Sequence, residues 1–169
     1  MQAISEFEGD YRFLSNFWPS VVVMDGHPYD SIEHAYQAAK TLDDDLRRPF
    51  RENVNANMAK KMGNALALRH DWEEVKLGIM KELVRNKFGN FDLMDKLLAT
   101  GDAILIEGNW WHDNFWGNCS CGKCRGQSGQ NNLGKTLMEI REEYRLLKEE
   151  RKGAVPFRYP PNSKIVEGA

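Results

Sequence analysis

The segment from Asp30 to Lys40 constrains the fold of this chain more than any other. It reads DSIEHAYQAAK, and most of its residues are small or apolar, as in a buried helix. Seven helical steps of roughly 100° leave Glu33 and Lys40 about 20° apart on one face, with Tyr36 and Gln37 on or near it. Because an unpaired charge that faces a core is costly, this polar stripe either faces solvent or lines a site.

The start of the same helix offers a simpler interpretation of Glu33. Asp30 and Glu33 have the spacing of a capping box, in which the glutamate accepts a backbone N–H at the helix start. A capping role would explain Glu33 without any site. It would not explain Lys40, which lies two turns later on the same face.

The composition excludes several classes of protein. The 169 residues suffice for one sizeable domain, and 41% hydrophobic with 28% charged residues is typical of a globular protein. The net charge of −2 gives no strong field toward nucleic acid or membranes. No apolar run approaches the roughly 20 residues of a membrane span, and the first residues lack signal-peptide character. We expect no membrane association, no extended nucleic-acid footprint and no obligate protein partner.

Hydrophobic periodicity predicts a mostly helical α+β domain. Val21–Met24 followed by Asp25-Gly26 predicts a β-hairpin, and Pro49 argues against an unbroken helix after Lys40. Four further helices are predicted at residues 57–68, 71–88, 91–99 and 132–150, and one strand at 103–107.

Local signals refine these boundaries. Asp71 and Glu74 form a second capping-box pattern, and Gly89 is a terminator. We expect one predominantly helical domain with a few short strands over residues 1–152. The proline-rich residues 153–169 then form an extended tail.

Two more segments combine polar and aromatic residues without a regular period. In residues 11–19, Arg12, Ser15 and Asn16 offer the groups that hold phosphates or sugar hydroxyls. In residues 109–118, four aromatic residues surround one acid, Asp113, and such a loop can stack a flat ring beside a carboxylate. The alternative for the second segment is an apolar plug with Asp113 as a turn residue.

All three cysteines, Cys119, Cys121 and Cys124, fall within six positions. This spacing suits metal binding or reduced thiols better than disulfides, so we expect a cytoplasmic protein. Three thiolates can converge on a structural zinc ion, with His112, another histidine or water as the fourth ligand. Reduced cysteines without a metal are the alternative.

Residues 129–136 formally match the P-loop pattern of nucleotide-binding proteins. The context argues against a P-loop, because a cysteine-rich loop rather than a strand precedes the pattern. Asn132 suits the start of the last helix. A free helix N-terminus beside Gly134 would be able to hold a phosphate by its backbone N–H groups.

Together these segments resemble the YbiA-like, or NADAR (NAD- and ADP-ribose-associated), superfamily. The match runs in order through residues 11–145. Its motifs are Phe13-Leu14-Ser15-Asn16-Phe17-Trp18-Pro19, Tyr29, Ser31-x-Glu33-His34-Ala35-Tyr36-Gln37-Ala38-x-Lys40, Trp72, Met80, Lys87-Phe88, Leu97-Leu98-x-Thr100-Gly101, Asp113-x-x-Trp116-Gly117 and Asn132-Leu133-Gly134-x-x-Leu137-Met138-x-Ile140-Arg141.

The resemblance implies a YbiA-like fold and an N-glycosidase that needs no cofactor for catalysis. Such enzymes cleave the bond between ribose C1′ and a nitrogenous base. The implied substrates are phosphoribosylated pyrimidine intermediates of riboflavin synthesis, or ADP-ribose attached to guanine in nucleic acid. The alternative function is a non-catalytic module that binds ADP-ribose or a nucleotide.

The chemistry of this reaction suits the residues. Positive charge develops at C1′ as the bond breaks, so nearby carboxylates stabilise the transition state, and the leaving base needs a proton. The resemblance implies Lys40 as a Schiff-base nucleophile, Glu33 as its proton-transfer partner and Asp113 as an acid or sugar-binding group. The substrate-binding residues that we expect are Arg12, Ser15, Asn16, His34, Trp72, Trp116, Gly117, Asn132 and Gly134.

Overall fold

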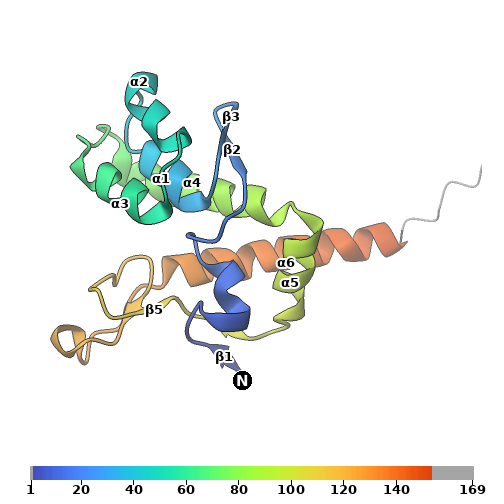
Figure 1. Ribbon diagram of the computed structural model, residues 1–169. Helices are drawn as coiled ribbons and strands as arrows, with labels where there is room; N and C mark the ends of the chain where they lie inside the picture. The colour runs from blue at the N-terminus through green and yellow to red at the C-terminus, as the bar shows by residue number, and fades with distance from the viewer. Residues whose placement is uncertain (1, 154–169) are drawn as a thin grey trace, which may run out of the picture.

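A computed structural model of the chain describes residues 2–153 and is mostly helical (Figure 1). The helices are α1 (Ile32–Ala38), α2 (Asp44–Arg47), α3 (Ala56–Ala65), α4 (Trp72–Phe88), α5 (Phe91–Ala99) and α6 (Asn132–Gly153), with 3₁₀ turns η1 (Gly9–Leu14), η2 (Arg48–Arg51) and η3 (Gly122–Cys124). The strands are β1 (Ala3–Ile4), β2 (Val22–Met24), β3 (His27–Tyr29), β4 (Ile104–Leu105), β5 (Gly108–Asn109) and β6 (Asn118–Cys119). The predicted α+β class is confirmed.

The strands form three two-stranded sheets in the described residues. β2 and β3 are the predicted hairpin, and Asp25 and Gly26 have φ values of 51° and 78°. Two positive φ values in succession are what a type I′ hairpin turn requires. β4 pairs in parallel with β1, and β5 with β6. β1, β5 and β6 were not predicted, because a strand of two residues has no alternating sequence pattern.

The helices pack around α4 and α6. α4 contacts α1, α5 and α6, while α1 also packs on α3. In Figure 1, α1, α2 and α3 gather at one end of the molecule, above the first turns of α6 and the loop around β5. The side chains buried between these helices include Leu14, Ile32, Phe88, Leu97 and Leu137. No helix among residues 2–153 is long and apolar enough to cross a membrane.

Helix α1 differs from the prediction at both ends. Its N-cap is Ser31, whose hydroxyl accepts the His34 N–H. The Asp30–Glu33 capping box is therefore wrong, and capping does not account for Glu33. The helix ends at Ala38, so Lys40 lies in the turn that follows, where its N–H donates to Gln37 O over 3.3 Å.

Other helix boundaries also shift. α3 begins one residue earlier than predicted and ends at Ala65, while α6 extends to Gly153. The second capping box is wrong as well, because the Asp71 carboxylate pairs with the Arg69 guanidinium and makes no cap hydrogen bond. Apart from residue 153, the predicted tail lies outside the described residues. The division of the chain at residue 152 stays a prediction.

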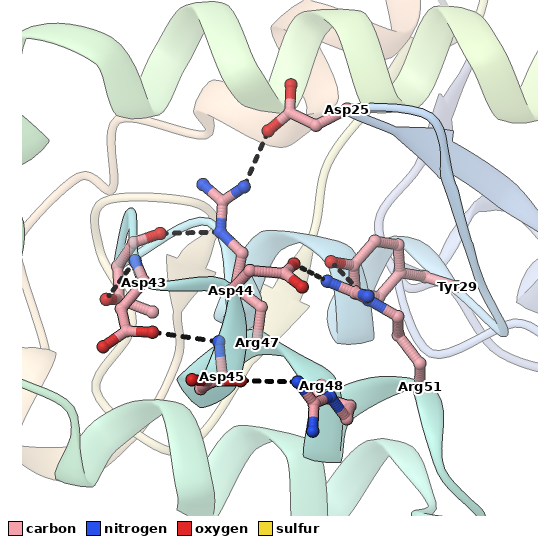
Figure 2. A network of polar contacts seen from close by, with 9 residues as sticks. Asp25, Tyr29, Asp43, Asp44, Asp45, Arg47, Arg48 and Arg51 are labelled. Atoms are coloured by element: carbon pink, nitrogen blue, oxygen red, sulfur yellow. Dashed lines mark hydrogen bonds and ion pairs between the residues drawn. The ribbon is translucent and has the colours of Figure 1, made fainter.

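Two arginines, Arg47 of α2 and Arg51 of η2, tie the segment after Lys40 to the hairpin (Figure 2). The buried Arg47 donates to Asp25 Oδ2 at 2.7 Å and to Thr41 O at 2.7 Å. Arg51 pairs with Asp44 and donates to the Tyr29 hydroxyl. These contacts fix the segment that links α1 to α3, so they also fix the position of the chain around Lys40.

Close packing at a glycine of α6 gives a test of the fold. A Cβ on the buried Gly134 would lie 2.1 Å from the backbone oxygen of Leu105, so helix and strand would have to separate. We expect Gly134→Ala to lower the free energy of unfolding by about 1–3 kcal/mol. Gly78 in α4 is exposed with open space around it. There the same substitution should stabilise the protein by roughly 0.5–1 kcal/mol. Chemical denaturation measures both, and equal effects would contradict the close contact.

Candidate active site

A cavity of about 370 Å³ opens where α1, α3 and α4 meet the segment of residues 7–17 and the loop of residues 107–116. Its volume is in the range of small-molecule sites. Eight of the twelve residues predicted to be catalytic or to bind substrate line it: Arg12, Ser15, Asn16, Glu33, Lys40, Trp72, Asp113 and Trp116.

Glu33 lies on the cavity side of α1 and is buried. Its Oε1 accepts a hydrogen bond of 2.8 Å from Gln37 Nε2, one turn later. Its backbone N–H donates to Asn16 O over 3.1 Å and so joins α1 to the segment after η1. Burial raises the pKa of the Glu33 carboxyl, and this outweighs the opposing hydrogen bond and the nearby Lys60 and Lys40 charges.

Lys40 enters the same cavity from the turn after α1. Its Nζ makes only long hydrogen bonds, 3.4 Å to Gly63 O and 3.3 Å to Asn64 Oδ1. Burial lowers the pKa of the Lys40 amine, and the positive charge of Lys60 acts in the same direction, while Glu33 opposes it. Among residues 2–153, no ion pair within 4 Å joins Lys40 to Glu33. Both groups are thus shifted toward their neutral forms.

The loop of residues 107–116 forms the facing wall. Asp113 Oδ1 accepts the backbone N–H groups of Phe115 and Trp116 at 3.1 and 2.8 Å. Asp113 is therefore a turn residue, as the second interpretation of this segment predicted. It also lines the cavity. The Trp116 ring meets Tyr36 of α1 edge to face, with 5.4 Å between ring centroids. This aromatic contact closes the wall against α1.

Glu107 is a residue of the site that the sequence did not predict. Glu107 follows β4, lines the cavity, and has a fully enclosed Oε2 atom. Burial, together with the charges of Asp113 and Glu33, raises the pKa of its carboxyl to about 7. The available signal was an acid at the end of an apolar run, which we interpreted only as part of a strand.

Unpaired acceptors gather at this cavity. Three buried side-chain atoms in the described part of the chain lack a hydrogen-bond partner: Asn16 Oδ1, Gln37 Oε1 and Glu107 Oε2. All three residues line the cavity. Buried polar atoms are almost always paired, so three unpaired oxygens around one cavity indicate a site for a ligand that carries several donors.

Besides Lys40, two cations at the cavity, Arg12 and Lys60, lack a carboxylate partner within 4 Å among the described residues. Lys60 Nζ instead lies over the rings of Phe17 and Trp111, at 5.8 and 5.6 Å from their centroids. A cation without a carboxylate partner beside a cavity can bind an anionic group of a ligand.

The buried Lys87 does not line the cavity, but it contacts the backbone of the segment that carries Ser15 and Asn16. It is 1% exposed, and its Nζ donates to Ser15 O at 2.8 Å. Burial lowers the pKa of the Lys87 amine to about 7. The hydrogen bond holds the backbone of the segment that carries Ser15 and Asn16.

Four residues expected to bind substrate do not line the cavity. His34 bridges Ser31 Oγ and Val54 O through its two ring nitrogens. Gly117 and Gly134 lie against the backbone oxygens of Glu107 and Leu105, where a Cβ would not fit. Asn132 holds the loop, since its backbone N–H and Nδ2 both donate to Phe115 O.

The start of α6 is therefore not the free anion site that the sequence suggested. The backbone N–H groups of Asn132 and Leu133 already donate to Phe115 O and Trp116 O.

The residues proposed for a metal do come together. One ligand atom from each of His112, Cys119, Cys121 and Cys124 lies within 4.8 Å of the others.

Most of this chain is similar to proteins of one known family. The sequence model of the NADAR domain matches residues 5–145. The chain is 38% identical over 139 residues to the N-glycosidase YbiA of Escherichia coli, which covers 79% of this chain and 82% of that protein. It is 38% identical over 143 residues to an N-glycosidase of Nostoc punctiforme, covering 81% of this chain and 88% of the relative.

Two further similarities extend the comparison. A riboflavin biosynthesis protein of Vibrio vulnificus is 37% identical over 147 residues, which span 84% of this chain but 38% of that longer protein. The NMR structure of E. coli YbiA superimposes with a TM-score of 0.75 at 35% identity, covering 89% of this chain and 90% of the other.

The raised pKa of Glu107 predicts a pH-dependent contribution to stability. The folded state holds the Glu107 proton up to a pKa of about 7, whereas the ordinary pKa of a glutamate is 4.5. This contribution is therefore fully present below pH 4.5 and lost as the pH rises through 7. The free energy of unfolding of the wild type minus that of Glu107→Gln should fall by on the order of 3 kcal/mol over this range.

Urea denaturation at a series of pH values measures this difference. The same series on Glu8→Gln, which changes an exposed glutamate of the same cavity, is the control. A difference between wild type and Glu107→Gln that does not change with pH would contradict the enclosed carboxyl.

Proposed function

Because this chain belongs to the NADAR domain family, we infer that it is an N-glycosidase, a hydrolase that acts on N-glycosyl bonds. We propose that its substrate is a ribosylated base with at least one phosphate. The two candidate classes are a phosphoribosylated pyrimidine intermediate of riboflavin synthesis and ADP-ribose attached to guanine.

The mechanism is supported by one observation: an amine and a carboxyl line the same cavity but do not form an ion pair with each other. Glu33 and Lys40 both line the cavity, and burial shifts the pKa of the acid up and that of the amine down. Such shifts enlarge the population that holds a proton on the acid and a free lone pair on the amine. These are the states that a general acid and an amine nucleophile require.

In the proposed reaction, Glu33 gives its proton to the ribose ring oxygen as the ring bond to C1′ opens. The Lys40 amine forms a bond to C1′. The bond from C1′ to the base then breaks, the base leaves with a proton from Nζ, and an imine joins Lys40 to the sugar. Water adds to the imine, Glu33 recovers its proton, and the sugar leaves Lys40 as ribose phosphate or ADP-ribose, the second product. The net change is hydrolysis of one C–N bond.

The rest of the cavity supports a ribosyl substrate. Ribose hydroxyls supply the donors that Asn16, Gln37 and Glu107 lack. Arg12 and Lys60 are the cations we assign to phosphate, in place of the start of α6. Asp113 faces the reacting sugar, where a carboxylate stabilises positive charge at C1′.

The aromatic residues of the cavity are assigned to the base. Trp116 is braced by Tyr36 and Phe115, with centroid distances of 5.4 and 4.9 Å, so its ring is fixed before a ligand arrives. Trp111 is 48% exposed and reaches the cavity beneath Lys60. A fixed ring and an exposed ring provide two surfaces for a flat base.

Substitution of Lys40 tests the mechanism. We expect Lys40→Ala to lower kcat for base release by at least about 10³-fold, since it removes the nucleophile, and Glu33→Gln to lower it by about 10²–10⁴-fold. The assay follows free base from ADP-ribosylated guanosine and, in parallel, from a phosphoribosylated pyrimidine. The exposed Lys61 of α3 gives the matched control, and Lys61→Ala should turn over as the wild type does.

Borohydride trapping separates the nucleophile from a purely electrostatic role. With substrate and borohydride, the wild type should gain the mass of the reduced sugar adduct on Lys40, and Lys40→Ala should gain none. Near-normal turnover of Lys40→Ala, with circular dichroism showing an intact fold, would refute the Schiff-base step. If the wild type binds both substrates and releases no base from either, the non-catalytic ADP-ribose-binding alternative is correct.

A further inference from the structure

The cysteine-rich loop lies outside the cavity and plays no part in the proposed reaction. His112 Nδ1 lies 3.1 Å from Cys121 Sγ and 3.5 Å from Cys124 Sγ, and Cys119 Sγ completes a group whose ligand atoms are all within 4.8 Å. All three cysteines are free thiols. Four soft or borderline donors therefore converge on one point from three separate parts of the loop.

The distances from His112 to two of the sulfurs are near those of a tetrahedral zinc site. With Zn–S of about 2.3 Å and Zn–N of about 2.0–2.1 Å, ligand atoms at the corners of a tetrahedron lie about 3.6–3.8 Å apart. The distances from His112 Nδ1 to the two sulfurs are close to this edge length, at 3.1 and 3.5 Å. Three cysteines and one histidine are one of the standard donor sets of structural zinc sites.

The loop has backbone hydrogen bonds but almost no apolar side chains of its own to hold it together. From Gly117 to Asn132 the chain contains no Leu, Ile, Val, Met or aromatic residue. Yet Cys119 and Cys124 are only 3% and 8% exposed, so the thiols occupy the interior that apolar side chains fill elsewhere. A segment without its own apolar core commonly needs a metal or a disulfide to stay folded.

The backbone at His112, one of the four ligands, has an uncommon conformation. His112 has a φ of 68°, a left-handed conformation that is uncommon for a residue with a side chain. The Cys121 N–H points to Cys119 Sγ at 3.5 Å, a contact that favours a thiolate as acceptor. Backbone strain of this kind persists only where surrounding interactions stabilise it.

His112 connects this cluster to the cavity. Its two neighbours in the chain, Trp111 and Asp113, both line the cavity, whereas none of the four cluster residues does. We propose that His112, Cys119, Cys121 and Cys124 bind one structural zinc ion, which holds the Trp111–Asp113 wall of the cavity in place. Four protein ligands fill a tetrahedral site, so this zinc has no open position for substrate or water.

Metal analysis of the purified, tag-free chain tests the site itself. We expect about one equivalent of zinc per chain in the wild type, and a loss of most of it in Cys119→Ser and in Cys121→Ser. Lys123→Ala, an exposed change between two ligands in the chain, is the matched control and should retain its zinc. Less than about a tenth of an equivalent in the wild type after growth with zinc would overturn the site.

Cobalt substitution keeps the test informative if the cysteine variants fail to fold. The Co²⁺ form of the wild type should show thiolate-to-metal charge transfer and the visible bands of a tetrahedral centre. A spectrum without thiolate charge transfer, or one with octahedral bands, would overturn the donor set. Both results are independent of N-glycosidase activity, so they do not stand or fall with the proposed function.

Hydrogen exchange tests the link between the metal and the cavity wall. Removal of zinc with a chelator should raise amide exchange in peptides that contain residues 110–118 by at least about tenfold, because the loop loses its anchor. Exchange in α5, on another part of the molecule, should stay unchanged. If zinc is bound but its removal leaves residues 110–118 as protected as before, the proposed role in the wall is wrong.

Discussion

The complete burial of α1 is the constraint on which the rest of the structure depends. All seven residues of this helix are buried, Glu33 and Gln37 included. Its alanines allow α3 and α4 to approach closely, and Gly63 of α3 leaves room where a Cβ would lie 2.0 Å from Gln37 Oε1. Because the helix is enclosed on its apolar sides, the side chains of Glu33 and Gln37 open into the cavity.

Burial at this place also sets the electrostatics of the site. Carboxyls and amines removed from water are shifted toward their neutral forms, and Glu33, Lys40 and Glu107 follow this rule. Burial lowers the pKa of Lys87 in the same way, next to the backbone of Ser15. Such groups reduce the stability of the fold, and the unpaired oxygens beside them add to the cost. Destabilised groups that gather at one cavity are typical of a functional site.

The two walls of the cavity are held by different means. The α1 side is fixed by the helical core, by the Arg47–Asp25 ion pair and by the Arg51–Tyr29 hydrogen bond, which join α2 and η2 to the hairpin. The facing wall is a loop, held by backbone contacts to the start of α6, by the Asp113 turn and, in our proposal, by zinc. This division explains why Gly117, Asn132 and Gly134 belong to the family motifs without lining the cavity. They pack the loop against β4 and α6.

The sequence by itself determined the helical class, the hairpin at Asp25-Gly26 and the α5 boundaries, because periodicity and turn chemistry are local properties. It also brought out Glu33, Lys40, Asp113 and Trp116 as candidates, all of which line one cavity. Only the tertiary structure decided that Glu107 belongs to the cavity and that the start of α6 is already occupied. These outcomes depend on which atoms distant segments bring together, and spacing along the chain carries no information about such contacts.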